Sequence, residues 1–181
     1  MGLLLTASRI YLPQFIQKRK LETLFAATAD AFQVSVPLTG GLSLEACLKL
    51  YAQFTREQSD KAFQRGNESA IKSRLFRNAY QIGKQLKSDF SINTAEEVMR
   101  LSAVLYKILR IEFQGGPQGN IIINSCFFSS CYSDSVCRLI SSLDEGLLSG
   151  LSGGGKLSFS QRITGGNSCC LAYLEISGIL K

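Results

Sequence analysis

Two adjacent cysteines, Cys169 and Cys170, follow a glycine-rich polar turn and begin an apolar run near the C-terminus. Thiols in such a place serve as metal ligands, as redox pairs, as nucleophiles or as small core residues. Successive side chains of a strand point to opposite faces, so these two thiols cannot act together on one atom. The pattern therefore predicts two thiols with separate surroundings.

Histidine is absent from all 181 residues. Its absence excludes Ser-His-Asp and Cys-His catalysis and every histidine-ligated metal. A catalytic thiol would then need a nearby cation to lower its pKa, and Arg162 is the cation nearest to the cysteine pair in the predicted hairpin. The spacing of Cys126 and Cys131 fits one half of a four-thiolate zinc site, so a thiolate metal site stays open as an alternative.

An acidic pair and a glycine run are two further candidate functional motifs. Asp144 and Glu145 fall within a predicted helix, where they serve either a site or a solvated face, and Glu145 is placed to pair with Arg162. The run "GGGK" at 153–156 has the glycines of a phosphate-binding loop but lacks the spacing and the Lys-Ser/Thr ending of that motif. It is typical of a helix-to-strand connection.

Apolar residues at helical spacing predict four helices in the first part of the chain, over 13–32, 42–66, 68–90 and 95–110. Gly66 is expected to end the second helix, and Asn67 to cap the third. Thr94 and Glu97 form the pattern of a capping box for the fourth.

The second part of the chain changes its pattern. Two apolar runs surround a Gly/Pro-rich loop at 115–120 and predict two strands, and helical spacing returns over 133–151. Alternation over 157–163 and the apolar run at 169–176 predict a closing hairpin. Both sides of the last strand are apolar, which predicts that both are covered. The fold class is α+β, with a helical layer on a mainly antiparallel sheet and a helix inserted between two strand pairs.

The positive charge is concentrated in the helical part. Residues 1–110 hold 16 basic and 9 acidic side chains, whereas the remaining residues hold 4 and 5. No nucleic-acid-reading motif accompanies this charge, so no nucleic-acid partner is predicted. The basic cluster Lys18, Arg19 and Lys20 lies on an amphipathic helix and indicates docking on a membrane or a partner, unless that helix packs on its own domain. The predicted division is an N-terminal extension, 1–40, and a ligand-binding domain, 41–181.

The sequence also bears on localisation. No stretch reaches the roughly 18 apolar residues of a membrane span, and the apolar N-terminus lacks the charge order of a secretory signal. Six cysteines without such a signal indicate free thiols in a reducing compartment. We expect a cytoplasmic protein, either free or peripheral on the cytoplasmic face of a membrane.

Two helical segments carry a family resemblance. The runs "LFRNAYQIGKQLKSDF" and "EEVMRLSAVLYKILRIEF" resemble the helical half of the superfamily of 4-vinyl-reductase-like domains, small transport-protein-particle subunits and the haem-NO-binding-like fold. The second half of the chain is similar to the same group and to the L-2-amino-thiazoline-4-carboxylic acid hydrolases. There Cys126 matches a strand-ending cysteine, Asp144 an acidic helix position, and Gly165-x-x-x-Cys169-x-Leu171 a closing hairpin motif.

The resemblance covers about residues 45–177 and implies an apolar pocket between helices and sheet. Some relatives bind hydrophobic small molecules, some are linked to chlorophyll biosynthesis, and others are assembly subunits. The chain departs from the hydrolases at Ser141, where they carry a cysteine, and it lacks the acylated cysteine that the transport subunits carry in the helix corresponding roughly to 50–65.

The resulting hypothesis is a non-catalytic module that binds a hydrophobic small molecule, with a tetrapyrrole as one candidate cofactor, or that helps to assemble a larger photosynthetic complex at a membrane. A protein partner or an oligomer is expected with it. A cysteine-dependent hydrolase and the thiolate metal site are the alternatives. The predicted ligand-binding residues are Cys126, Asp144, Arg162, Cys169, Leu171 and Tyr173.

Overall fold

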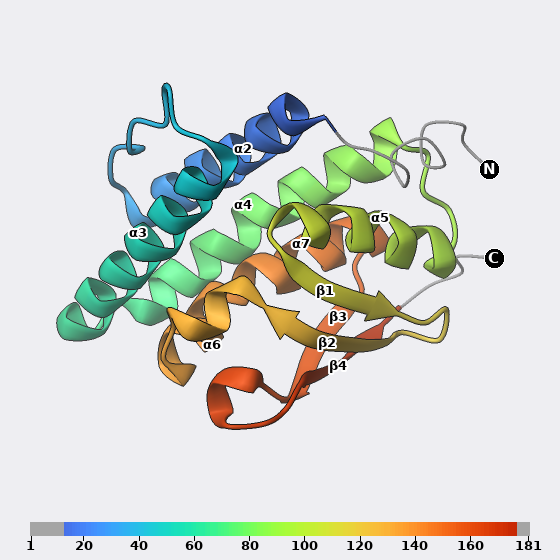
Figure 1. Ribbon diagram of the computed structural model, residues 1–181. Helices are drawn as coiled ribbons and strands as arrows, with labels where there is room; N and C mark the ends of the chain where they lie inside the picture. The colour runs from blue at the N-terminus through green and yellow to red at the C-terminus, as the bar shows by residue number, and fades with distance from the viewer. Residues whose placement is uncertain (1–12, 177–181) are drawn as a thin grey trace.

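The computed structural model describes residues 13–176, in which helices cover one face of a four-stranded antiparallel sheet (Figure 1). The helices are α2 (Gln14–Phe32), α3 (Leu44–Arg65), α4 (Glu68–Asp89), α5 (Ala95–Ile108), α6 (Asp134–Ile140) and α7 (Ser142–Ser152). The strands are β1 (Ile111–Gly115), β2 (Asn120–Cys126), β3 (Lys156–Gln161) and β4 (Cys170–Glu175), with short 3-10 helices η1 (Phe127–Ser130) and η2 (Ile163–Gly165). The predicted α+β class is confirmed, including the helical insertion between two strand pairs.

Local capping chemistry explains where the long helices begin and end. Gly66 ends α3 in the left-handed conformation, and Thr94 and Glu97 form both bonds of the predicted capping box at α5. Asn67 precedes α4 as predicted, but its side chain makes no capping bond and its Oδ1 is buried without a partner. The position of Asn67 before the helix was therefore predictable from the sequence, whereas its capping hydrogen bond was predicted wrongly.

The helix predicted over 133–151 is wrong as a single element, because it is broken at Ser141 into α6 and α7. The Ser141 hydroxyl donates to the carbonyl of Cys137, 2.6 Å away, and accepts a bond from Arg162 Nη1, also at 2.6 Å. A serine that bonds back to the preceding turn bends a helix. The break places the start of α7 beside the end of β2, where the candidate site lies.

The sheet has the order β1-β2-β4-β3, so β1 and β3 are its edges. Alternation in β4 turns Cys170 and Leu174 toward the helices and Leu171 and Tyr173 to the opposite face. Tyr173 is 47% exposed, and Ile122, which pairs with Leu171 across β2 and β4, is 39% exposed. Within residues 13–176 the helices cover one side of the sheet only, so the expectation that both sides of the last strand are covered is not met there.

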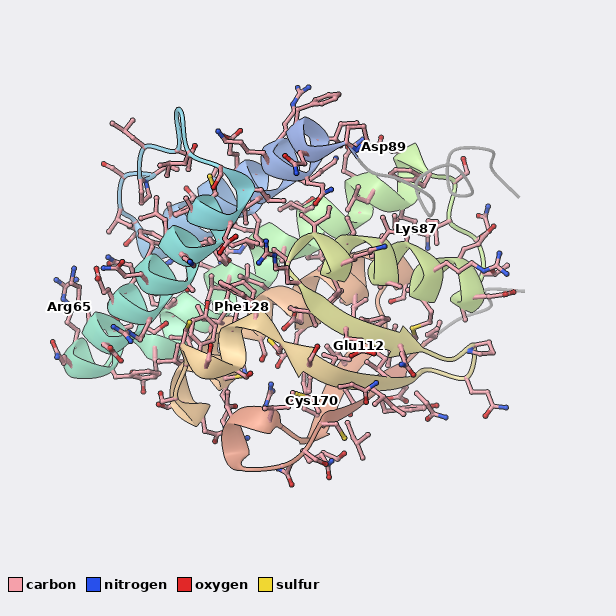
Figure 2. The ribbon with its side chains drawn as sticks, viewed as in Figure 1. Arg65, Lys87, Asp89, Glu112, Phe128 and Cys170 are labelled. Atoms are coloured by element: carbon pink, nitrogen blue, oxygen red, sulfur yellow. The ribbon has the colours of Figure 1, made fainter. Side chains whose placement is uncertain are left out.

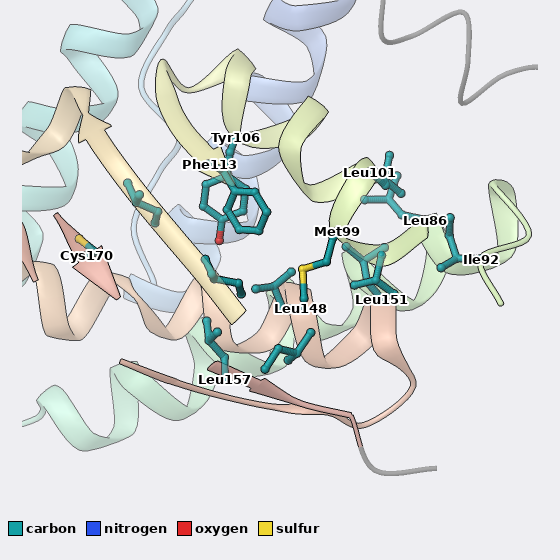
Figure 3. Packing of buried hydrophobic residues seen from close by; sticks show 14 residues of the cluster. Leu86, Ile92, Met99, Leu101, Tyr106, Phe113, Leu148, Leu151, Leu157 and Cys170 are labelled. Atoms are coloured by element: carbon teal, nitrogen blue, oxygen red, sulfur yellow. The ribbon is translucent and has the colours of Figure 1, made fainter. Parts of the chain in front are cut away.

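The main core lies between the sheet and helices α4, α5 and α7 (Figure 3). The rings of Tyr106 and Phe113 stack at 4.7 Å between centroids and join α5 to β1. Leu148 and Leu151 of α7 and Leu157 of β3 belong to the same buried cluster as these two rings. Burial of this cluster fixes α5 and α7 over the inner face of the sheet.

Helix α2 packs on α3 and α4 rather than standing apart. Phe25 is fully buried and meets Tyr51 of α3 edge-to-face at 5.1 Å, and Arg74 of α4 donates from Nε to the carbonyl of Ala31 at 2.7 Å. Of the two alternatives for this basic helix, packing on its own domain is the one observed for Gln14–Phe32. The first 12 residues of the predicted extension lie outside the described residues.

Helices α4 and α7 approach each other through glycines. A Cβ atom at Gly83 would lie 2.2 Å from the carbonyl oxygen of Leu147, and one at Gly150 would lie 2.3 Å from that of Tyr80. The two helices therefore touch backbone to backbone, which only glycine allows. This contact sets the separation of the layers that enclose the site.

Among residues 13–176, none of the helices has the length and apolar character needed to cross a bilayer.

Candidate functional site

An apolar cavity of about 180 Å³ lies between the helices and the β1–β2 end of the sheet. Its wall is contributed by α2, α3, α4, α5, α6 and α7, by Ile111 and Cys126 of the sheet, and by Phe128 and Tyr132 that follow it. Phe128, labelled in the interior of Figure 2, meets Tyr51 edge-to-face at 5.9 Å. The apolar part of the wall includes Leu21, Leu24, Ala79, Ile82, Leu86, Leu105, Ile108, Leu143 and Leu147.

The lining of the cavity extends along α4. Ala79 and Leu86 both line it and stand seven residues apart on α4, which corresponds to about 10 Å along a helix at 1.5 Å per residue. A volume of about 180 Å³ spread over that length leaves a narrow cross-section. The space therefore suits a slender molecule better than a broad one.

One end of the cavity carries a buried carboxyl group. Asp144 lines the wall from the first turn of α7, and Tyr106 Oη donates a hydrogen bond to its Oδ1 at 2.7 Å. Burial raises the pKa of Asp144 to about 6, against the lowering effects of the Tyr106 bond and of the Arg162 charge. The Asp144 side chain has some accessible surface, but part of that surface faces the cavity rather than bulk water. Burial is therefore still the main cause of its raised pKa.

Two thiols line the same end. Cys126 ends β2, and burial raises the pKa of its thiol to about 12, with the Asp144 carboxylate adding to the rise. Cys137 comes from α6, and Arg162 Nη1 lies 3.9 Å from its sulfur. A thiol with a pKa near 12 stays protonated at neutral pH, so Cys126 is a poor nucleophile and a weak metal ligand.

Arg162 stands directly behind this end. It is 8% exposed, its Nη1 donates to Ser141 Oγ, and its guanidinium carbon lies 3.9 Å from the centroid of the Phe159 ring. The predicted pair of Glu145 with Arg162 is wrong, since the carboxylate of Glu145 lies 4.0 Å from Lys72 Nζ instead. The guanidinium thus acts on the cavity through Ser141 and through its field at Asp144.

Of the six predicted ligand-binding residues, the fold brings three together. Cys126 and Asp144 line the cavity and Arg162 adjoins it. Cys169, Leu171 and Tyr173 are not among the residues that line it. Leu171 and Tyr173 lie on the uncovered face of β4, and Cys169 precedes that strand.

The paired cysteines have the separate surroundings that alternation predicts. Cys169 Sγ accepts from Gln161 Nε2 at 3.3 Å, whereas Cys170 Sγ accepts from the amide of Ile163 at 3.4 Å. Burial raises the pKa of Cys170. All six cysteines are unpaired, and residues 13–176 contain no group of three or more cysteines and carboxylates that could hold a metal ion.

The other end of the cavity lies at α2. Lys20 and Thr23 both line it and both are exposed, so the opening lies on this side of the molecule. Lys18 and Arg19 are on the same helix, and Phe15, one turn earlier, is 73% exposed. Of the predicted docking cluster, Lys20 thus lies at the opening of the cavity.

Three tyrosines were missed as site residues. Tyr106 orients Asp144, while Tyr51 and Tyr132 line the middle of the cavity with their hydroxyls bonded to Thr28 and Thr55. A sequence signal existed, because each tyrosine falls in or near an apolar run, where a buried hydroxyl needs a partner. The partner itself is set by the tertiary fold.

No protein-family model matches this sequence, and no curated protein is similar to it. The site is therefore interpreted from its own geometry.

Proposed function

We propose that this protein is a non-catalytic binding protein for a slender hydrophobic small molecule. The observation that carries the proposal is the elongated apolar cavity with a single buried carboxyl group at its inner end. An engineered cavity of about 150 Å³ in another protein, lined by aliphatic and aromatic side chains, binds benzene. A cavity of about 180 Å³ is large enough for a ligand of somewhat greater length.

The inner end indicates what the ligand presents there. Asp144 is a hydrogen-bond acceptor for Tyr106 and, because its pKa is raised to about 6, a group that exchanges a proton near neutral pH. A ligand hydroxyl or amine satisfies it at low cost, whereas a ligand carboxylate would face a like charge. We infer an apolar chain with a neutral or basic polar end.

A tetrapyrrole is less well supported than such a chain. Pockets for ligands of drug size have volumes of about 300–1,000 Å³, and the volume of the cavity here, about 180 Å³, is smaller than that. A planar macrocycle would require α4 and α7 to separate, and their glycine contact resists this. The proposed ligand is therefore linear.

The hydrolase alternative has less support. It requires a nucleophilic thiol near Asp144 and Arg162, and Cys126, which has that position, is held protonated by burial. Cys169 lies outside the cavity. A role at a membrane or in the assembly of a larger complex remains a proposal that rests on Lys18, Arg19 and Lys20 beside the exposed Phe15.

We expect protein isolated from its native cells to contain a bound ligand. Native mass spectrometry should detect it as a non-covalent complex with added mass. Organic extraction should release a molecule without visible absorption, because the cavity suits a chain rather than a conjugated ring system. A visible tetrapyrrole spectrum in the extract would overturn the inference of a linear ligand. Ligand-free protein that also fails to take up hydrocarbon probes would overturn the function.

A further inference from the structure

A second concavity lies on another side of the molecule, between α4, α6, α7 and the edge strand β3. It is an open cleft of about 600 Å³ and shares no lining residue with the apolar cavity. Its polar character differs as well, since charged and hydroxyl side chains make up much of the wall. The proposed binding of a hydrophobic ligand makes no use of this cleft.

Positive charge converges on this cleft. Its lining includes Lys72, Arg138, Lys156 and Arg162; Lys72 pairs with Glu145, which also lines the cleft, and Arg138 pairs with Asp134 outside it. Residues 111–181 carry a small net negative charge, so the cluster does not follow from the local composition. The fold gathers it by bringing the first turns of α4 beside α6 and β3.

One buried group in the wall, Arg162, lacks partners that it needs. Arg162 is 8% exposed, yet no carboxylate of residues 13–176 pairs with its guanidinium, and its Nε has no hydrogen-bond partner. Ser149 is 6% exposed and also lines the cleft. Arg162 lies in the field of Asp144 but forms no ion pair with it, so an anion in the cleft would give this buried cation a direct partner.

The glycine run predicted as a plain connection borders the same cleft. Gly154, Gly155 and Lys156 line it, but the amide of Gly154 donates to the carbonyl of Ser149 and that of Gly155 to Ser152 Oγ. These amides are not free to cradle a phosphate. Side chains must therefore hold the anion, with Lys156 as the exposed contact and Ser149 and Arg162 as the buried ones.

Aromatic rings complete the site. Phe76 of α4 is 38% exposed in the cleft, and Phe159 of β3 lines it with the Arg162 guanidinium over its ring. A bare inorganic anion would leave these apolar surfaces in water. From this geometry we propose that the cleft binds a small organic molecule that joins a phosphate-like oxyanion to an aromatic or apolar group.

Phenyl phosphate is the probe for this proposal, titrated into the full chain at neutral pH and constant ionic strength while amide NMR resonances are followed. We expect saturable shifts at Ser149 and over 154–159, with a dissociation constant of about 1 mM or below. Lys156→Gln should raise that constant at least about tenfold, because it removes a charge-assisted contact. Lys156 is exposed, so the variant should melt at the wild-type temperature.

Lys61→Gln, on the exposed face of α3, is the matched control and should change the constant by less than about twofold. Equal weakening by both variants would overturn the proposal, because it would mean attraction to the general positive field. Shifts that do not saturate by about 10 mM phosphate ester would overturn it as well. Phenol that binds as tightly as phenyl phosphate would remove the oxyanion from the proposal, and inorganic phosphate that binds as tightly would remove the aromatic group.

Discussion

Replacing Asp144 with asparagine is expected to stabilise the protein by about 3 kcal/mol at pH 8 and to leave its stability nearly unchanged at pH 4. Burial raises the pKa of Asp144 from 3.8 to about 6. A carboxyl group with a raised pKa holds its proton in the folded state after the unfolded chain has lost it, so the folded state loses stability as pH rises through that window. A rise of about two in pKa, at about 1.4 kcal/mol for each, gives the expected change in the free energy of unfolding.

Asparagine is the informative replacement because its amide keeps an oxygen for the Tyr106 hydroxyl, which donates to Asp144 at 2.7 Å. Urea unfolding of both proteins between pH 4 and 8 measures the difference in the free energy of unfolding. The control is Asp134→Asn, at a partly exposed carboxylate whose pKa is lowered by its hydrogen bond with Arg138 and which should therefore show the opposite sign at pH 8. An Asp144→Asn gain that is equal at both pH values would contradict a buried, proton-exchanging carboxyl.

The second large effect is expected at the contact of α4 with α7. In Gly150→Ala the new Cβ would lie 2.3 Å from the carbonyl oxygen of Tyr80 and 2.7 Å from the amide nitrogen of Lys84. Both are backbone atoms, so the helices must move apart. We expect a loss of about 3 kcal/mol or more in the free energy of unfolding, at the upper end of overpacking costs and despite the better helix propensity of alanine.

Thermal and urea unfolding check this expectation, with Gly40→Ala as the control. Gly40 lies in the loop between α2 and α3 with open space around its Cβ position, so alanine there should be nearly neutral. Gly150→Ala should also change the shape of the cavity, because it moves α4 and α7 apart and these helices supply the lining residues Ala79 and Leu147. If Gly150→Ala and Gly40→Ala unfold alike, the close packing of these layers is refuted.

Much of the fold could be predicted because its signals are local. The capping box of Thr94 with Glu97 and the glycine at 66 mark helix ends through bonds within a few residues. The break at Ser141 could not be predicted, because it depends on Arg162, which comes 21 residues later and reaches back to the serine hydroxyl. Periodicity alone continues smoothly across that position.

The site was predictable only in part, for a related reason. Cys169 and Cys170 have separate surroundings as predicted, but Cys169 precedes β4, so strand alternation is not the reason. Alternation also gives the face of a strand and not what covers that face. Leu171 and Tyr173 are apolar and were therefore expected at the ligand, yet they lie on the uncovered side of the sheet. The bond of Tyr106 to Asp144 joins residues 38 positions apart, beyond the reach of any local pattern.

Titration of the full chain with octanol, followed by methyl NMR, tests the proposed binding function most directly. We expect saturable shifts at the methyl groups of Leu86, Leu105 and Leu147, which line the cavity. Ala79→Leu fills the same space and should weaken binding at least about tenfold, whereas Ala26→Leu on the exposed face of α2 should not. Unchanged affinity in Ala79→Leu, or shifts confined to Ile122 and Leu171 on the uncovered face of the sheet, would contradict a ligand-binding cavity.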